Sequence, residues 1–173
     1  MKTFNNFHDL AINRYSVRKF KPTPVEKDKL DKILDVARWA PTAKNRQPQR
    51  IKVITSKKDL AKVDEFTPCR FGAPLVFLVC FDTKDSKVWE RLGGQHSGET
   101  DATIVATHMM LQACDLGLGS LYIKYFDPQK AIELLGLHQD IKPSAVLAVG
   151  YAADDSEPHK LHFDKKPLKD ILL

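Results

Sequence analysis

The chain has 173 residues, of which 43% are hydrophobic and 28% are charged, a balance typical of one globular domain with its own core. The N-terminal stretch lacks the apolar segment of a secretory signal, and the longest apolar run, 74–81, is too short to cross a bilayer. We therefore expect a soluble, cytoplasmic protein without a membrane partner. The net charge of +5 is dispersed, with no basic stretch interleaved with aromatic residues, so the sequence does not favour a nucleic-acid partner.

Two helices are predicted near the N-terminus, a short one over 5–13 and a stronger one over 23–39. In the second, Thr23 can serve as the cap, Pro24 suits the first turn, and Glu26 offers the carboxylate of a capping box. Its apolar residues follow helical spacing, so one face should meet the core.

The middle of the chain predicts a strand over 50–55, a helix over 57–65 and a strand over 74–81. The last of these is continuously apolar, as expected of a strand buried on both faces. A longer helix is predicted over 97–116, ending at Gly117. Apolar residues cover most of its circumference, which indicates burial inside the fold or at a subunit interface.

The remaining elements are a strand over 119–124, a helix that Asp127 caps and that ends at 135, and a buried strand over 144–151. The rest is polar, so we expect 152–173 to form an extended arm of a single domain spanning 1–173. Together the elements predict an α+β fold in which helices pack on a central sheet.

Familiar catalytic constellations are missing from the sequence. It has no Gly-x-Ser-x-Gly elbow, no Gly-Lys-Ser/Thr phosphate loop and no His-Glu-x-x-His. Neither its three cysteines nor its six histidines have metal-like spacing. Cys80 and Cys114 are interpreted as small buried hydrophobes, Cys69 as an accessible loop residue, and His108 as a hydrogen-bonded structural histidine. Gly-Leu-Gly-Ser at 117–120 joins a helix to a strand, the wrong order for a dinucleotide-binding turn.

The first candidate site segment is Arg-Tyr-Ser-Val-Arg-Lys-Phe at 14–20. In an extended chain, alternation places Arg14, Ser16 and Arg18 on one side. Two guanidinium groups and a hydroxyl suit a phosphate, because arginine offers forked donors and a permanent charge. A solvated basic segment explains the same pattern equally well.

Two further segments are candidates for the same site when they are considered together with the first. The loop at 40–49 contains two prolines, a hydroxyl and several amide side chains, which suit the edge of a heterocycle but also fit a plain helix-terminating loop. The tail at 157–168 adds cations that could reach an anionic ligand, although a solvated terminus is the simpler explanation.

Taken in this order, the segments resemble the nitroreductase family nearly end to end. The resemblance begins with Arg-x-Ser-x-Arg-x-Phe at 14–20 and Ala-Pro-Thr-Ala-x-Asn-x-Gln-Pro at 40–48. It continues with Gly-Leu-Gly-Ser at 117–120 and Phe-Asp-Pro at 126–128. It closes with Val-Gly-Tyr at 149–151 and Lys-Lys-Pro-Leu at 165–168.

The resemblance implies an α+β sandwich with an antiparallel-rich sheet, in an intertwined homodimer whose two FMN molecules lie in clefts built from both subunits. Residues matching the element that holds the phosphate and ribityl chain and reaches the pyrimidine ring are Arg14, Ser16 and Arg18. Those matching the loop supplied by the other subunit are Pro41, Thr42, Ala43, Asn45 and Gln47. Those matching the strand end along the isoalloxazine ring are Tyr122, Ile123, Lys124 and Tyr125. Lys165 matches a phosphate-contacting tail position that is often arginine.

The function implied by the resemblance is FMN-dependent NAD(P)H oxidoreduction. NADH or NADPH would deliver hydride to the flavin, leave, and be replaced by a small acceptor such as a nitroaromatic or a quinone, in a ping-pong mechanism. No side chain need act as a catalytic residue. Three departures from the commonest pattern, Thr42-Ala43, Gln49 and Lys165, leave the acceptor open. The alternatives are other flavin chemistry, such as reductive dehalogenation or flavin fragmentation, and a flavin-binding module with little turnover.

Overall fold

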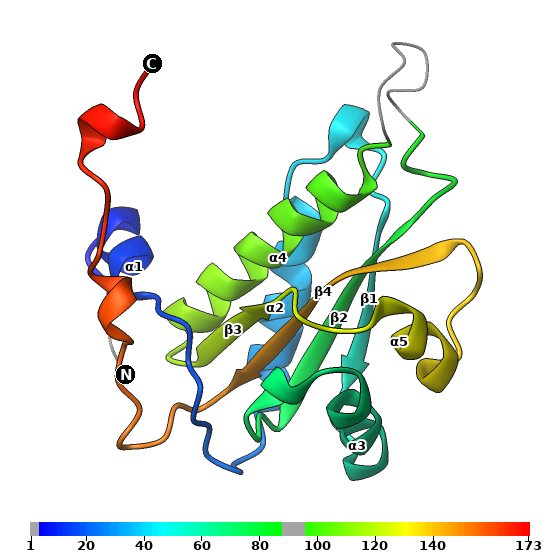
Figure 1. The fold of residues 1–173 in the computed structure, drawn as a ribbon, viewed down its shortest axis with the longest axis horizontal. Helices are drawn as coiled ribbons and strands as arrows, with labels where there is room; N and C mark the ends of the chain where they lie inside the picture. The colour runs from blue at the N-terminus through cyan, green and yellow to red at the C-terminus, as the bar shows by residue number, and fades with distance from the viewer. Residues whose placement is uncertain (1–3, 88–95) are drawn as a thin grey trace.

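The computed structural model describes residues 4–87 and 96–173, and a four-stranded sheet forms its centre (Figure 1). The strands are β1 (Gln49–Ile54), β2 (Leu75–Asp82), β3 (Gly119–Ile123) and β4 (Ile141–Gly150). They lie in the order β1-β2-β4-β3, and every neighbouring pair is antiparallel. The prediction of an α+β fold with an antiparallel-rich sheet is confirmed.

Two pairs of helices cover the two faces of the sheet. One face packs against α2 (Lys27–Trp39) and α4 (Gly98–Asp115), and the other against α3 (Lys57–Phe66) and α5 (Pro128–Leu135). Along β2, Phe77 and Val79 pack on the face covered by α2 and α4, whereas Val76 and Leu78 pack on the face covered by α3 and α5. Both faces of this strand are buried, which confirms the interpretation of its apolar run.

Helix α4 presents two different faces. Its inner face, which includes Ala102, Val105 and Met109, is fully buried, whereas Ile104 and Leu111 on its outer side are only partly covered. The Nδ1 atom of His108 lies 2.9 Å from the carbonyl oxygen of Ile104, so the prediction of a hydrogen-bonded structural histidine is confirmed. A single chain therefore leaves a half-exposed apolar strip along α4.

Gly117 ends α4, as predicted, by adopting the left-handed conformation with φ of 76°. The Leu118 N–H donates to the Ala113 carbonyl at 2.8 Å, and the Gly117 N–H donates to the Cys114 carbonyl at 2.9 Å. These two bonds satisfy carbonyls that the helix end would otherwise leave unpaired. The tight turn leads straight into β3.

The predicted start of α2 is wrong. The helix begins at Lys27, and its cap residue Glu26 makes no side-chain capping bond. The Glu26 carboxylate instead accepts a hydrogen bond from the Tyr151 hydroxyl at 2.7 Å, just after β4. This tertiary contact takes away the carboxylate that a capping box needs, so Thr23 and Pro24 lie outside the helix.

Strand β4 begins at Ile141, three residues before the predicted start. Pro143 lies opposite Cys80, where the register with β2 shifts. Such a bulge accommodates a proline, which cannot donate to the ladder. The predicted strand therefore lacked residues 141–143, because a proline in that segment is unusual for a strand.

The N-terminal segment joins the edge of the sheet to the C-terminal arm. After α1 (Phe7–Asn13), the Val17 N–H donates to the Ser120 carbonyl at 3.1 Å, and the Lys21 N–H donates to the Tyr151 carbonyl at 2.8 Å. The arm, 152–173, lies beside α1 and contains two short turns, η4 (Lys160–His162) and η5 (Leu168–Asp170) (Figure 1). All of its residues are at least partly exposed.

The cysteines agree with their interpretation in two cases out of three. Cys80 is buried, and desolvation raises the pKa of its thiol to about 12. Cys69 is partly accessible, as expected, but Cys114 is only half-buried because it faces a cavity. Among the described residues, no helix combines the length and the apolar character that a bilayer crossing requires.

Candidate functional site

The predicted phosphate-binding residues from both ends of the chain meet at one cavity of about 230 Å³. Arg14, Ser16 and Arg18 line it from the N-terminal segment, and Lys165 lines it from the arm. The remaining lining residues, which the sequence did not suggest as site residues, are Tyr15, His159, Leu161 and His162. The structure thus brings together four residues that lie up to 151 positions apart.

Local geometry explains why the N-terminal side chains face this cavity. Val17 is 1% exposed and anchors the segment in the core, so its neighbours Ser16 and Arg18 point the other way. The anchor needs Gly119, because a Cβ atom at that position would lie 2.6 Å from Cγ2 of Val17. Arg18 also donates from Nη1 to the Ser16 carbonyl at 3.3 Å.

Contacts near the chain ends hold the arm over the cavity. The Tyr15 hydroxyl donates to the Ser156 carbonyl at 3.1 Å, and the Nε2 atom of His162 lies 3.0 Å from the Ile12 carbonyl oxygen. The rings of Tyr15 and His162 also pack edge to face. These partners are 141 and 150 positions apart, so no spacing pattern could have marked them.

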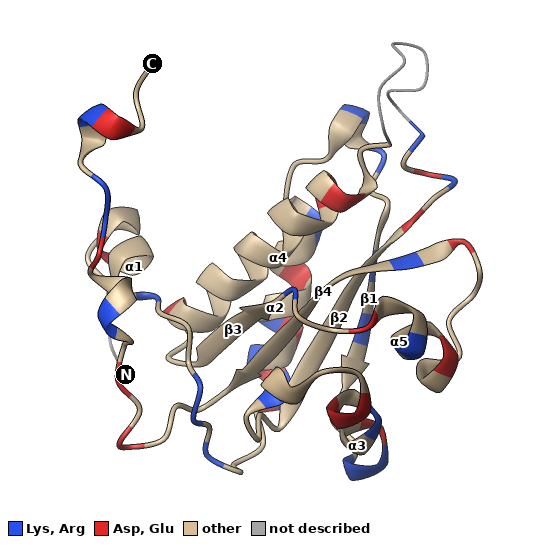
Figure 2. Cartoon of the chain, in the orientation of Figure 1, with Lys and Arg blue, Asp and Glu red and all other residues tan. Residues whose placement is uncertain are grey.

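The charge of this cavity is one-sided. Three cationic side chains line it, and among the described residues no carboxylate does. The nearby Lys19 and Lys21 differ, because each pairs with an aspartate of the arm, Asp155 at 2.6 Å and Asp154 at 2.5 Å. Figure 2 shows the basic positions of the N-terminal segment and of the arm on the same side of the molecule. The arrangement suits an anion such as a phosphate.

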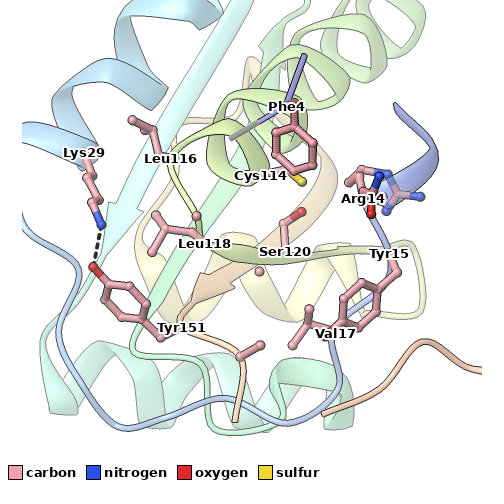
Figure 3. Close-up of a pocket in the computed structure, with 14 residues that line it drawn as sticks. Phe4, Arg14, Tyr15, Val17, Lys29, Cys114, Leu116, Leu118, Ser120 and Tyr151 are labelled. Atoms are coloured by element: carbon pink, nitrogen blue, oxygen red, sulfur yellow. Dashed lines mark hydrogen bonds between the residues drawn. The ribbon is translucent and has the colours of Figure 1, made fainter. Parts of the chain in front are cut away.

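A larger cavity, of about 530 Å³, lies against the same segment (Figure 3). Arg14 lines both cavities, and here Ser120 is buried with an Oγ atom that has no hydrogen-bond partner among the described residues. On the opposite wall, Lys29 donates to the Tyr151 hydroxyl at 2.6 Å, and this bond is the main reason that the pKa of Lys29 is raised. The walls between are largely apolar, formed by Phe4, Val17, Leu116, Leu118 and Ala152.

The predicted strand end at 122–125 carries four side chains in different surroundings. Ile123 is 3% exposed and belongs to the core, so only its backbone can touch a ligand. Lys124 donates to Glu99 in the first turn of α4 and to the Ser144 carbonyl, both at 2.7 Å. The ammonium of Lys124 lowers the pKa of Glu99 by hydrogen bonding and by charge. Tyr122 places its hydroxyl 3.4 Å from Oγ1 of Thr103.

Tyr125 ends this segment with a side chain that is 75% exposed and a fixed backbone. Its carbonyl accepts a hydrogen bond at 2.7 Å from the hydroxyl of Thr67, a residue that is 1% exposed. Lys124, Tyr125 and Thr67 line a third cavity, of about 420 Å³. Sequence reasoning missed Thr67, which lies 58 positions away from its partner.

The predicted loop after α2 has a strained backbone. It contains a short turn, η1 (Ala43–Asn45), and Lys44, Asn45 and Gln47 have φ between 50° and 54°. The left-handed region is unfavourable for residues with a Cβ atom, and such strain tends to gather at functional sites. Thr42 stabilises the loop, because its hydroxyl accepts from the Gln47 N–H at 3.0 Å and its carbonyl from the Asn45 N–H at 2.9 Å.

Within one chain, the loop and the phosphate-binding residues lie at opposite ends of α4. The Ala43 N–H bonds to Asp101, in the first turn of α4. Arg14 shares its larger cavity with Cys114 and Leu116, at the other end of that helix. A helix of 18 residues is about 27 Å long. The structure therefore does not bring Pro41, Thr42, Ala43, Asn45 and Gln47 to the Arg14 cavities of their own chain.

Comparison with known proteins decides the family. A family model described as the nitroreductase family matches residues 11–70 and 67–151, which together make up most of the chain.

The chain belongs to the nitroreductase family.

Relatives agree with this assignment. The chain is 39% identical to a nitroreductase family protein from Clostridium difficile 630, with a TM-score of 0.88 and 97% of each chain covered. It is 30% identical over 158 residues to a protein named FMN reductase [NAD(P)H] from Bacillus subtilis strain 168, covering 82% of this chain and 64% of that one. A nitroreductase-like protein from Exiguobacterium sibiricum, solved with FMN, shares the fold at 21% identity, with a TM-score of 0.82 and coverage of 99% and 98%.

Proposed function

We propose that this nitroreductase-family protein is an FMN-dependent NAD(P)H oxidoreductase that works as a homodimer. The observation that carries the proposal is the cationic cavity where Arg14, Arg18 and Lys165 meet, with no carboxylate among the described lining residues. The FMN reductase from B. subtilis and the FMN-bound protein from E. sibiricum support the choice of cofactor.

The donors present fit the phosphate of FMN. Arg14 and Arg18 offer forked N–H donors, Lys165 offers an ammonium, and Ser16 adds a hydroxyl. Charge-assisted bonds of this kind are about twice as strong as neutral ones. Lysine in place of arginine at 165 keeps the charge but gives up bidentate geometry.

The ring of FMN would be held along the end of β3, by Tyr122, Lys124, Tyr125 and the backbone of Ile123. Because Thr67 fixes the Tyr125 carbonyl, the peptide that follows it has one orientation. Lys124 turns its ammonium toward Glu99, so Arg18 is the better candidate for a cation near the pyrimidine edge, and the phosphate would then be held by Arg14, Ser16 and Lys165. A preorganised cation stabilises negative charge most where water is excluded.

A second copy of the chain would complete the cleft. Loop 41–47 lies at the opposite end of α4 from Arg14, so an antiparallel packing of two α4 helices would bring each loop to the other chain's phosphate-binding residues. The half-exposed apolar strip of α4, with Ile104 and Leu111, suits such an interface. The exposed apolar side chains of the arm would also gain cover there.

The chemistry needs no catalytic side chain, because bound FMN supplies the group that accepts and donates hydride. The chain binds the phosphate, orients the ring and excludes water from it. One cleft would admit NADH or NADPH and then a small acceptor such as a nitroaromatic or a quinone, which predicts ping-pong kinetics. A cytoplasmic location stays a prediction.

A visible spectrum tests the proposed function. The purified protein, supplied with FMN and freed of excess, should show oxidised-flavin absorbance that NADH or NADPH bleaches without oxygen and that a quinone then restores. A protein that stays colourless after incubation with FMN would refute the proposal. Bound flavin that neither nucleotide reduces would limit the protein to flavin binding.

A further inference from the structure

Asp101 is a buried acidic residue with an unusual pair of partners. It is 3% exposed, and both of its carboxylate oxygens accept hydrogen bonds. Oδ1 accepts from the Ala43 N–H at 2.9 Å, and Oδ2 accepts from the Ser97 hydroxyl at 2.8 Å. A buried carboxylate is costly unless it is bonded in this way. Glu99 also places a negative charge in the first turn of α4, but from an exposed position. A favourable charge at the helix start therefore does not require a buried Asp101.

The hydrogen bond from the Ala43 N–H to Asp101 holds the strained loop at its first turn, η1. The loop residues Lys44, Asn45 and Gln47 are all left-handed, and each such residue with a side chain costs on the order of 1 kcal/mol. A segment under this strain relaxes unless outside contacts determine its shape. Thr42 supplies contacts within the loop, whereas Asp101 ties the loop to helix α4, 58 positions away along the chain.

We propose that Asp101 is a positioning residue that holds loop 42–47 in the shape needed to contact the flavin bound by the partner subunit. The inference rests on the proposed function, because that function places FMN beside the loop of a second copy. Among the described residues, the hydrogen bonds of the Asp101 carboxylate go to Ala43 and Ser97, and not to the phosphate-binding residues or the strand end at 122–125. Its influence therefore passes through Ala43 to the cleft of the other subunit.

The first test compares two aspartates that each accept a serine hydroxyl near a helix start, of which Asp101 is buried and Asp59 is partly exposed. At the start of α3, Asp59 also accepts a serine hydroxyl, from Ser56 at 2.8 Å, but that pair lies away from the loop. Asp101→Ala should raise the dissociation constant of FMN at least tenfold, measured by quenching of flavin fluorescence in a sample that sediments as wild type does. Asp59→Ala should change it less than twofold. Equal affinity of Asp101→Ala and wild type would overturn the inference.

Two more variants separate the loop contact from burial and charge. Asp101→Asn keeps an oxygen for the Ala43 N–H and can pair its amide with Ser97, so it should keep FMN affinity within threefold of wild type. Ala43→Pro removes the N–H donor and leaves Asp101 in place, so it should weaken FMN binding as Asp101→Ala does. This variant decides the matter if Asp101→Ala fails to fold, and wild-type affinity in Ala43→Pro would contradict the role of the bond.

A heterodimer tests whether the effect crosses between subunits. One subunit carries Arg14→Ala, the other carries Asp101→Ala, and two affinity tags isolate the mixed species. If the loop serves the partner's cleft, both lesions fall in one cleft and the other is intact, so half of the sites should bind FMN with wild-type affinity. Weakened FMN binding in both clefts would show that the loop serves its own chain and would overturn the proposal. Failure of wild type to bind FMN would instead refute the proposed function.

Discussion

Arg14 is the charged residue that connects the two cavities beside the N-terminal segment. It lines both the 230 Å³ cavity, with Arg18 and Lys165, and the 530 Å³ cavity, with Ser120. No other guanidinium among the described residues lines both cavities. A phosphate bound here would therefore depend on Arg14 more than on a cation at the edge of the site.

Replacing Arg14 should weaken FMN binding strongly. A hydrogen bond to a charged group contributes about 1.5–3 kcal/mol, so Arg14→Ala should raise the dissociation constant of FMN roughly 10- to 100-fold. Fluorescence titration measures this directly. Lys57→Ala, on the exposed start of α3, serves as the control and should change the constant less than twofold. Equal effects of the two variants would remove Arg14 from the site.

Gly119→Ala should destabilise the fold by disturbing Val17. The added Cβ atom would meet Cγ2 of Val17 at 2.6 Å, and overpacking of this kind typically costs 1–3 kcal/mol. Urea denaturation should show this loss in the free energy of unfolding. Because the two residues touch, Val17→Ala in the same chain should cost less than the sum of the single changes. Strict additivity would show that the overlap is relieved elsewhere.

Local patterns predicted some of these residues and could not predict others. Alternation over 14–18 is a local property, so it indicated that Arg14, Ser16 and Arg18 share a side, and all three do line one cavity. Asp101 and Thr67 act on residues 58 positions away, and His162 contacts a residue 150 positions away. Such contacts exist only after the chain has folded, so the sequence alone offered no signal for them.

At the scale of elements, the predictions succeeded where one local signal dominated. The apolar composition of β2 was enough to indicate burial on both faces. The position of Gly117 after a helical pattern was enough to indicate the end of that helix. The start of α2 failed because Glu26 bonds to Tyr151, 125 positions away, in place of its own helix start. The start of β4 failed because a bulge accommodates Pro143.

Helix α5 offers a test at this scale, because both its ends follow sequence rules. The Asp127 carboxylate accepts from the Lys130 N–H at 3.0 Å, and Pro128 takes the first position. Asp127→Ala should lower the free energy of unfolding by about 1 kcal/mol, the usual worth of such a cap. Gln129→Ala, which removes only an exposed contact with Glu133, should cost less than about 0.5 kcal/mol. Chemical denaturation of the two variants compares them, and an equal cost would contradict the capping role.

At the scale of the whole molecule, a single chain leaves apolar surface that a second chain would cover. Apart from the outer strip of α4, the arm exposes large side chains, including Leu161 at 61%, Phe163 at 72% and Ile171 at 65%. Helices α2, α3 and α5 each carry both acidic and basic residues, as α3 does in Figure 2, so the net charge of +5 comes from several elements. These features favour association with another copy over binding to nucleic acid.

The most direct test of a flavin held between two copies is sedimentation equilibrium followed at the visible absorbance of FMN. The proposed arrangement predicts that all bound flavin sediments with twice the 19.6 kDa chain mass, at one FMN per chain. Flavin that sediments with a single chain, or that stays free while the protein sediments without it, would contradict the shared cleft.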